Sequence, residues 1–255
     1  MKERYFGIDV VFDKQEVDEI VATHIREKKT GYVVSLSMNN AVITYNDPVH
    51  RDIVNGSIVT FSDSSWFPIM VNHVYHTHYK NYCSADMFEE IVKSRKYRQF
   101  FLGNTQRVLD GLRSKLSEWD PAIMDMGFQE LPYRTVEEFD YKGIARMLNE
   151  YKADIIWVSL GAPKQEQFMA RLLPYLEQGV MFGWGALFNF YSGVDDAPKR
   201  APKWMQRLKL EWFFRLLNDK NVRKKDKKFG TYSTPLKMIR EEKRMLRSQK
   251  GQKKS

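Results

Sequence analysis

Short apolar runs alternate with stretches of helical periodicity along most of this chain, and this alternation restricts its fold more than any other feature. The apolar runs are rich in β-branched and aromatic residues, as strands are, and they cover Tyr32–Leu36, Ile58–Ser62, Gln99–Leu102, Ala122–Met126, Asp154–Leu160 and Val180–Trp184. The helical stretches lie near residues 15–28, 39–54, 85–96, 105–118, 135–150, 164–177, 203–217 and 235–248. Pro48 is expected to bend or split the second of these helices. The pattern predicts an α/β fold: a Rossmann-like parallel sheet with helices on both faces.

The charge of the chain is distributed unevenly. Residues 199–255 hold 20 Lys and Arg against 5 Asp and Glu, a net charge of +15, whereas residues 1–198 carry −6. We therefore expect an α/β body over residues 1–198 and a basic, helical C-terminal appendage over residues 199–255. Such an appendage favours an anionic partner, which charge alone leaves open between nucleic acid, a phosphorylated small molecule and an acidic lipid surface.

The end of the appendage contains one further helical pattern. Residues 220–232 are polar and rich in turn formers, and they are typical of a linker. Beyond them, apolar side chains form one stripe among lysines and arginines: Leu236, Met238, Ile239, Met245 and Leu246. Two interpretations stay open, a helix that lies on an anionic bilayer surface and a helix that packs its stripe on the body.

Cysteine content and hydropathy restrict the compartment. With 255 residues, 43% of them hydrophobic, the chain can bury a substantial core. Its single cysteine, Cys83, excludes an intramolecular disulfide framework and a paired-thiolate zinc site, so a reducing compartment is expected. The first 16 residues carry charges where a signal peptide needs its apolar segment, and no run of 18 apolar residues occurs. We expect neither secretion nor a membrane span.

Polar side chains follow several of the predicted strands, where ligands bind in open α/β sheets. Ser35 and Ser37 come at the end of the first strand and suit hydrogen bonds to a sugar or phosphate, although N-capping explains them as well. Asp63 ends the second strand and is either a general base or a helix cap. The turn at 103–105, Gly-Asn-Thr, is a weaker candidate for a phosphate cradle.

The most specific string in the chain is GAPKQE at residues 161–166. Gly161 permits a tight turn between strand and helix. Lys164 and the N–H groups of the first helical turn favour an anion, and Gln165 and Glu166 offer hydrogen bonds to hydroxyls.

Other chemistries are not expected. The G-x-G of residues 183–185 has Phe188 where a dinucleotide fingerprint needs its third glycine, so a nicotinamide enzyme is disfavoured. The chain contains no D-x-D pair to hold a nucleotide-bound Mg²⁺. His73, His76 and His78 lie close together, but no carboxylate or cysteine accompanies them at ligand spacing. We therefore predict no metal and no cofactor.

Three ordered strings resemble the WecG/TagA/CpsF family of bacterial glycosyltransferases, glycosyltransferase family 26. They are GAPKQE at 161–166, RAPKWMQ at 200–206 and LEWFFRLL at 210–217, and the resemblance extends from Phe6 through Arg223. It implies transfer of a sugar, typically N-acetylmannosamine or its uronic acid, from a UDP donor to an undecaprenyl-diphosphate-linked amino sugar. It also implies a part in building a cell-surface polysaccharide or a teichoic-acid-type polymer.

The resemblance assigns roles to individual residues. Asp63 matches the proposed catalytic base of the family, and Ser35 and Ser37 take the places of its threonine and asparagine. The donor sugar and diphosphate are expected to meet two groups of residues: Gly161, Lys164, Gln165, Glu166 and Asn189 in the body, and Arg200, Arg215 and Arg223 in the appendage. Arginine suits a diphosphate because its charge-assisted hydrogen bonds are often bidentate.

Some residues depart from the family pattern. Ser64 and Ser65 replace the glycines that usually follow the catalytic aspartate, and Ser84 replaces a glycine before Asp86. Asn189 stands where relatives usually have aspartate. These departures leave the identity of both sugars open, whereas the reaction class depends on Asp63.

Together these features predict an inverting, metal-independent glycosyltransferase. Its lipid-linked acceptor implies a cytoplasmic protein that is peripheral on the inner face of the bacterial plasma membrane; whether it forms a homo-oligomer stays open. The alternative is a nucleic-acid-binding module that uses the basic appendage and its aromatic side chains: Trp204, Trp212, Phe213 and Phe214. The spacing of these aromatics favours packing on a core, so we expect no nucleic acid as a partner.

Overall fold

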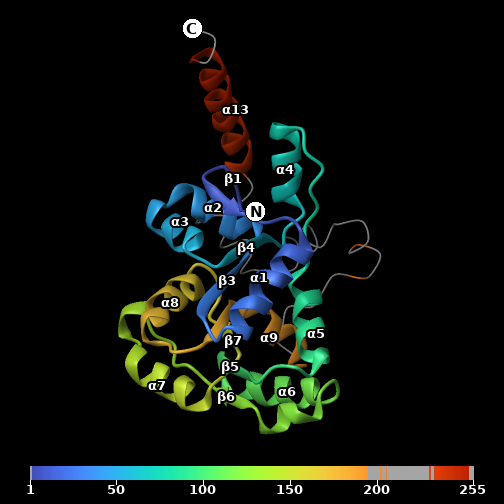
Figure 1. Ribbon diagram of the computed structural model, residues 1–255, viewed down its shortest axis with the longest axis vertical. Helices are drawn as coiled ribbons and strands as arrows, with labels where there is room; N and C mark the ends of the chain where they lie inside the picture. The colour runs from blue at the N-terminus through green and yellow to red at the C-terminus, as the bar shows by residue number, and fades with distance from the viewer. Residues whose placement is uncertain (1, 195–201, 203–204, 206–229, 231–232, 253–255) are drawn as a thin grey trace.

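A six-stranded parallel sheet forms the centre of the protein (Figure 1). The computed structural model describes residues 2–194, 202, 205, 230 and 233–252. The strands run in the order β4-β3-β8-β7-β5-β6, and every neighbouring pair is parallel. Their bounds are β3 Thr30–Leu36, β4 Val59–Ser62, β5 Gln99–Gly103, β6 Gly127–Gln129, β7 Ile155–Ser159 and β8 Gly179–Gly183. The predicted parallel α/β sheet is therefore confirmed.

Helices follow most of the strands. They are α1 Lys14–Arg26, α2 Met38–Asn46, α3 Pro48–Asn55, α4 Trp66–Tyr75, α5 Ser84–Ser94, α6 Gln106–Ser117, α7 Tyr141–Tyr151, α8 Lys164–Leu172, α9 Gly185–Tyr191 and α13 Thr234–Gln252. The predicted split at Pro48 is confirmed, because Asp47 ends α2 and its carboxylate then caps α3 through the Val49 and His50 N–H groups. Pro48 fits the first position of α3, where no N–H is needed.

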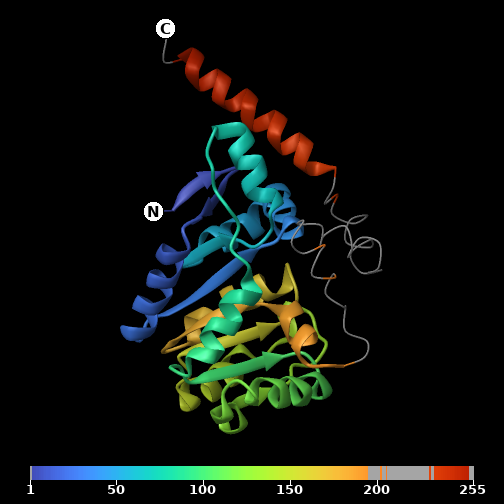
Figure 2. The ribbon, with the colours of Figure 1, turned by 90° about the vertical axis from the view of Figure 1, so that its right-hand side faces the viewer.

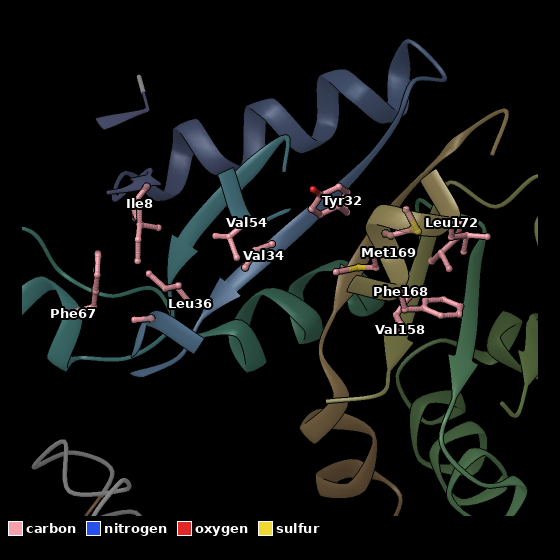
Figure 3. Close-up of a cluster of buried hydrophobic side chains, with 14 of the residues drawn as sticks. Ile8, Tyr32, Val34, Leu36, Val54, Phe67, Val158, Phe168, Met169 and Leu172 are labelled. Atoms are coloured by element: carbon pink, nitrogen blue, oxygen red, sulfur yellow. The ribbon is translucent and has the colours of Figure 1, made fainter. Parts of the chain in front are cut away.

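Each face of the sheet has its own hydrophobic core. In β7, Ile156 and Val158 point to one face and Ile155 and Trp157 to the other, and all four are fully buried. The first core includes apolar residues of α2, α3 and α8 (Figure 3), and the second includes those of α1, α5 and α6. This burial on both faces explains why the strands are continuous apolar runs rather than alternating ones.

A short N-terminal hairpin precedes the sheet and was not predicted. Strands β1, Glu3–Tyr5, and β2, Ile8–Val10, pair antiparallel. Phe6 and Gly7 form the two-residue turn with φ values of +53° and +77°, the geometry of a type I′ hairpin turn. Phenylalanine is not typical of a turn position with positive φ, so the sequence does not predict this turn.

One predicted strand was wrong, and two helices, α4 and α9, were not predicted. Residues Ala122–Met126 are not a strand: Pro121–Asp125 form a 3₁₀ helix that Asp120 caps, and β6 begins only at Gly127. Helix α4 was not predicted, because most of its residues are apolar, without a clear helical period, and it contains Pro68. A proline is tolerated there because it lies in the first helical turn.

Helix α13 packs against the body on α4 and α2, and Figure 2 shows it crossing the end of α4. Met238 is fully buried, and Ile239 and Leu246 are partly buried against the first core. Leu236 and Met245, at the edges of the stripe, remain 61% and 43% exposed. The interpretation that the stripe packs on the body is thus confirmed for its middle, while its edges face outward.

Much of the predicted appendage lies outside the described residues. This holds for the helix predicted at 203–217 and, apart from Gly230, for the linker predicted at 220–232. Among the helices that the structure describes, none is both long and apolar enough to cross a bilayer.

Candidate active site

The candidate site lies at the edge of the sheet where the parallel strands end. Because β4, β3, β8 and β7 are neighbours and run in the same direction, the turns that follow them meet at this edge. These turns carry Ser35 and Ser37, Asp63, and the two glycine-containing segments at 159–161 and 183–185. Open α/β sheets bind ligands in the crevice at this edge.

Asp63 directly follows β4 and is half-buried. Its Oδ1 accepts a hydrogen bond of 2.8 Å from the N–H of Ser84, the first residue of α5. The positive end of a helix stabilises a carboxylate there and fixes its direction. Asp63 thus accepts from the first N–H of α5 rather than capping the helix that directly follows it, and its role as a general base stays a prediction.

The thiol of Cys83 is next to this carboxylate. Burial, and after it the negative charge of Asp63, raises the pKa of Cys83. At neutral pH the side chain is then a protonated thiol, which is a poor nucleophile.

Ser35 and Ser37 lie where β3 ends. The Ser37 hydroxyl accepts from the Asn40 N–H at 3.2 Å, so it is the N-cap of α2. The Ser37 N–H in turn donates to the Ser35 carbonyl at 3.1 Å, which gives the turn a fixed shape. A capping hydroxyl still has a proton to donate, so the cap does not preclude a ligand.

The side-chain amide of Gln165 joins the two turns that follow β7 and β8. Its Oε1 accepts from the N–H groups of Gly161, at 3.0 Å, and Gly185, at 3.1 Å. Its Nε2 donates to the Gly183 carbonyl and to Oε1 of Glu166. Gln165 is 5% exposed and Glu166 is fully buried, so both side chains bond to the protein rather than to open solvent. Their expected contact with the donor sugar stays a prediction.

Asn40 connects α2 to α8 beneath the site. Its Nδ2 donates to Glu166 Oε1 at 3.2 Å, and its Oδ1 faces Nε2 of His50 at 2.8 Å, which therefore carries the proton. All three side chains are fully buried. Burial lowers the pKa of His50, which the charge of Asp47 only partly opposes, so the imidazole is neutral at pH 7. Asn40 lies in the turn that follows the first predicted strand but was not among the predicted site residues, and His50 was missed because it lies in no strand-end turn.

A second polar cluster surrounds Asn189, which α9 brings to the ends of β5 and β7. Asn104 Nδ2 donates to Ser159 Oγ at 3.1 Å and to Asn189 Oδ1 at 3.3 Å. Ser159 Oγ donates to the Gly185 carbonyl at 3.0 Å. The cluster therefore ties Asn189 to the same turn that Gln165 holds. The expected contact of Asn189 with the donor stays a prediction.

Two features of the GAPKQE segment bear on ligand access. Gly161 has φ +75°, and a Cβ there would meet no atom of the described residues within 4 Å. Among these residues, the backbone conformation alone requires glycine, and the space beside it is open. Lys164 does not point into that space: its Nζ donates to the Arg134 carbonyl and lies 5.1 Å from the Phe139 ring centre.

The N-terminus of α6 does not form the phosphate cradle suggested by residues 103–105. The N–H of Gln106 donates to the Glu130 carboxylate at 3.1 Å. A carboxylate of the protein therefore takes the place at this helix end where a phosphate was expected.

The three histidines do not form a cluster either. His73 Nε2 accepts from Lys243 of α13 at 2.8 Å, and His76 ends α4 in a left-handed conformation. Within the part of the chain that the structure describes, no three His, Cys, Asp or Glu side chains come together as metal ligands do.

The basic and aromatic residues expected to act in the appendage cannot be located in the same way. Arg200, Arg215 and Arg223, together with Trp204, Trp212, Phe213 and Phe214, lie outside the described residues. The diphosphate contacts assigned to the three arginines stay predictions.

A carboxylate, hydroxyls and amides gathered where parallel strands end define an α/β enzyme with its ligand crevice at the carboxyl edge of the sheet. Within that class, the chain belongs to the WecG/TagA/CpsF family of glycosyl transferases, whose profile matches residues 4–224. The match covers the described body from residue 4 onward and ends before α13. The protein is thus a glycosyltransferase, as its sequence predicted.

Two relatives have names that specify a reaction. An N-acetylglucosaminyldiphosphoundecaprenol N-acetyl-β-D-mannosaminyltransferase of Bacillus subtilis strain 168 is 28% identical over 200 residues, 76% of this chain and 74% of the relative. A protein of the same name from Bacillus spizizenii strain W23 is 22% identical over 206 residues, covering 80% and 77%. This chain is similar to both over most of their length.

Proposed function

We propose that this glycosyltransferase moves N-acetylmannosamine, or a closely related hexose derivative, from a UDP donor to N-acetylglucosaminyl-diphospho-undecaprenol. The names of the two Bacillus relatives support both the sugar and the lipid-linked acceptor. The family match over residues 4–224 supports the reaction class. The product would be an intermediate of a cell-surface polysaccharide or teichoic-acid-type polymer.

The observation that carries the proposed mechanism is the carboxylate of Asp63, held at the site edge by the N-terminus of α5. Asp63 accepts the proton of the attacking acceptor hydroxyl, whose oxygen bonds to the anomeric carbon as the bond from that carbon to UDP breaks. A single displacement of this kind inverts the anomeric configuration. UDP leaves with the negative charge, which the arginines of the appendage, Arg200, Arg215 and Arg223, would stabilise without a metal.

The remaining site residues would bind and orient the two substrates. Ser35 and Ser37 lie at the end of β3, beside β4, and offer hydroxyls to the acceptor. Asn189 and the open space at Gly161 lie on the other side of β8 and suit the donor. Gln165 and Glu166 would act on the donor by shaping the turns around it, because both are buried.

A lipid-linked acceptor requires the enzyme to reach a bilayer, and α13 with α4 supplies a suitable surface. On α13 the exposed Leu236 and Met245 lie among cations, and α4 exposes Trp66 and Ile69 by 39% and 51%. Each Lys or Arg near an anionic membrane contributes about 1 kcal/mol, which salt screens. We propose peripheral binding on the cytoplasmic face of the bacterial membrane through this surface.

The test of the activity is direct. Purified protein is incubated with a panel of UDP-sugars and a short-chain polyprenyl-diphosphate N-acetylglucosamine, without divalent metal, and UDP release and product mass are followed. We expect transfer from UDP-N-acetylmannosamine or a near relative. Loss of all activity without added metal, restored by Mg²⁺, would contradict the metal-independent mechanism, and no transfer under any condition would contradict the proposed substrates.

Membrane binding has its own test. Vesicles that contain about one third anionic phospholipid are sedimented with the protein. We expect the protein to sediment with them at low salt and to stay in the supernatant at about 0.5 M NaCl, where the Debye length is only about 4 Å. Retention that does not depend on salt would contradict the electrostatic part of this proposal.

A further inference from the structure

Residues 81–84, which we call the strap, run beside the loop that carries Asp63. The N–H of Tyr82 donates to the Ser62 carbonyl at 2.9 Å, and the N–H of Ser84 donates to Asp63 Oδ1 at 2.8 Å. The strap therefore holds the end of β4 by its main chain and the carboxylate of Asp63 by the first N–H of α5.

Asn81 adds two contacts made by its side chain. Its Nδ2 donates to the main-chain carbonyl of Asp63 at 3.2 Å, and its Oδ1 accepts from Ser65 Oγ at 3.3 Å. The main-chain contacts of the strap could be made by many residue types, but these two need a group that donates and accepts at once, as an amide does. The identity of residue 81 therefore matters for the position of Asp63.

We propose that Asn81 is a positioning residue for the base: it fixes the peptide of Asp63, so that the carboxylate stays on the α5 N-terminus and is aimed at the acceptor hydroxyl. This inference rests on the proposed role of Asp63. A base displaced by about 1 Å can lose up to ~10²-fold in rate, so two hydrogen bonds to its loop have a large effect on turnover.

Ser65 makes the contact particular to this chain. It occupies one of the two positions where the family usually has glycine, and a glycine would offer Asn81 no hydroxyl. The neighbouring Ser64 accepts from the Trp66 N–H at 3.2 Å and so fixes the start of α4. The hydroxyls of both serines thus help to hold this turn, Ser65 through Asn81 and Ser64 through the Trp66 N–H.

The decisive experiment compares Asn81→Ala with Asn72→Ala. Asn72, on α4, holds the segment that leads into the strap: its Nδ2 donates to the Tyr79 carbonyl at 2.9 Å, and its Oδ1 accepts from the Tyr79 N–H at 2.8 Å. Each variant removes an asparagine side chain that bonds to the main chain, but only Asn81 bonds to the Asp63 loop.

We expect Asn81→Ala to lower kcat by about 10-fold with KM for donor and acceptor within about 2-fold, because only the base moves. Asn72→Ala should keep kcat within about 2-fold at a similar loss of Tm. Asn81→Asp keeps the acceptor for Ser65 and lacks the donor to Asp63, and it is expected to lose as much as Asn81→Ala. Ser65→Ala should lose less, and its effect should not add to that of Asn81→Ala, because both act through one contact.

A second measurement does not depend on activity. The Ser84 amide is held by the Asp63 carboxylate, so its hydrogen exchange reports whether the base stays in place. We expect exchange to accelerate by about 10-fold in Asn81→Ala, the equivalent of one lost hydrogen bond, and not in Asn72→Ala.

Two results would overturn the proposal: equal losses of kcat in the two alanine variants, or unchanged exchange at Ser84 in Asn81→Ala. A wild-type protein that transfers no sugar would instead contradict the proposed function. The exchange measurement would still decide whether Asn81 holds Asp63.

Discussion

The two halves of the site edge are held in place by different means. The acid half comprises the turns after β3 and β4, with Asp63, and its supports come from outside: the strap lies against the Asp63 loop, and α13 packs on α2 and α4. The amide half comprises the turns after β7 and β8. It is held from within, by the buried amide of Gln165 and the buried carboxylate of Glu166.

This difference affects how easily the turns in each half can change shape. A turn held by a buried amide cannot change without disturbing the core, so the amide half keeps one geometry. The Asp63 loop depends instead on contacts from the strap, such as the two hydrogen bonds of the Asn81 side chain. Substitutions in the strap can therefore move this loop without disturbing the core.

The largest expected effect is on the acid half. Asp63→Asn removes the base with little change in shape, so kcat should fall by about 10²–10⁴-fold while the protein stays folded. Turnover measured beside a thermal unfolding curve checks both statements. Full activity in this variant would remove Asp63 from the mechanism and erase the chemical difference between the halves.

The amide half should respond in stability instead. Gln165→Ala leaves the buried Gly183 carbonyl and the partly buried N–H groups of Gly161 and Gly185 without their partner, at about 1–3 kcal/mol for a fully buried group and less for the other two. We expect the free energy of unfolding in urea to fall by about 3 kcal/mol, since partial relaxation reduces the sum. Gln167→Ala, two residues along the same helix, is the matched control and should cost less than about 1 kcal/mol. Equal losses would show that the amide is not the support.

We call the contacts of Glu242 with Phe6 and Tyr75 the brace, and removing it is expected to have a smaller effect. Glu242 of α13 is 7% exposed, and its Oε1 accepts from the Phe6 N–H at 3.1 Å and from the Tyr75 hydroxyl. Burial and the bond to Glu242 raise the pKa of Tyr75, so it remains a donor. Glu242→Ala should destabilise the protein by about 2 kcal/mol.

The neighbouring Glu241→Ala is the control for this brace. Its carboxylate is exposed and bonds to the Tyr45 hydroxyl, so removing it should change stability by no more than about 0.5 kcal/mol. If the two variants lost the same stability in urea, α13 would not brace the acid half through Glu242.

The smallest effect concerns His50, which bonds to Asn40 of α2; Asn40 in turn bonds to Glu166 in the amide half. Because burial lowers the pKa of His50 in the folded state, the unfolded chain takes up its proton first as the pH falls below about 6.5. Folding stability should therefore decrease with falling pH in that range, by at most about 1.4 kcal/mol per pH unit from this residue. His50→Gln should flatten the slope of Tm against pH. An equal flattening in the exposed His78→Gln would contradict this assignment.

Much of the fold could be predicted because its signals are local. The strands β3, β4, β5, β7 and β8 are continuous apolar runs, and the position of Asp63 at the end of β4 follows directly from them. The split at Pro48 follows from proline chemistry. The glycosyltransferase class was predicted from the three family strings, and composition and periodicity alone would not have predicted it.

The supports of the site could not be predicted, because they depend on how distant segments meet. Asn81 reaches Asp63 only because α4 leads the chain outward and residues 76–83 bring it back, and α4 itself has no amphipathic pattern. Gln165 looked like a ligand-binding amide, since the sequence does not reveal that Gly183 and Gly185 surround it. Burial and partner identity are tertiary properties, and local spacing does not contain them.

The bond between Glu242 and the turn of the N-terminal hairpin joins positions 236 residues apart. A growing chain makes its hairpin first but cannot close this bond until α13 has left the ribosome. The first strands to be synthesised are thus among the last to be completed. A chain that stops before α13 would leave Met238's site in the core open and the Phe6 N–H of the hairpin turn without its acceptor.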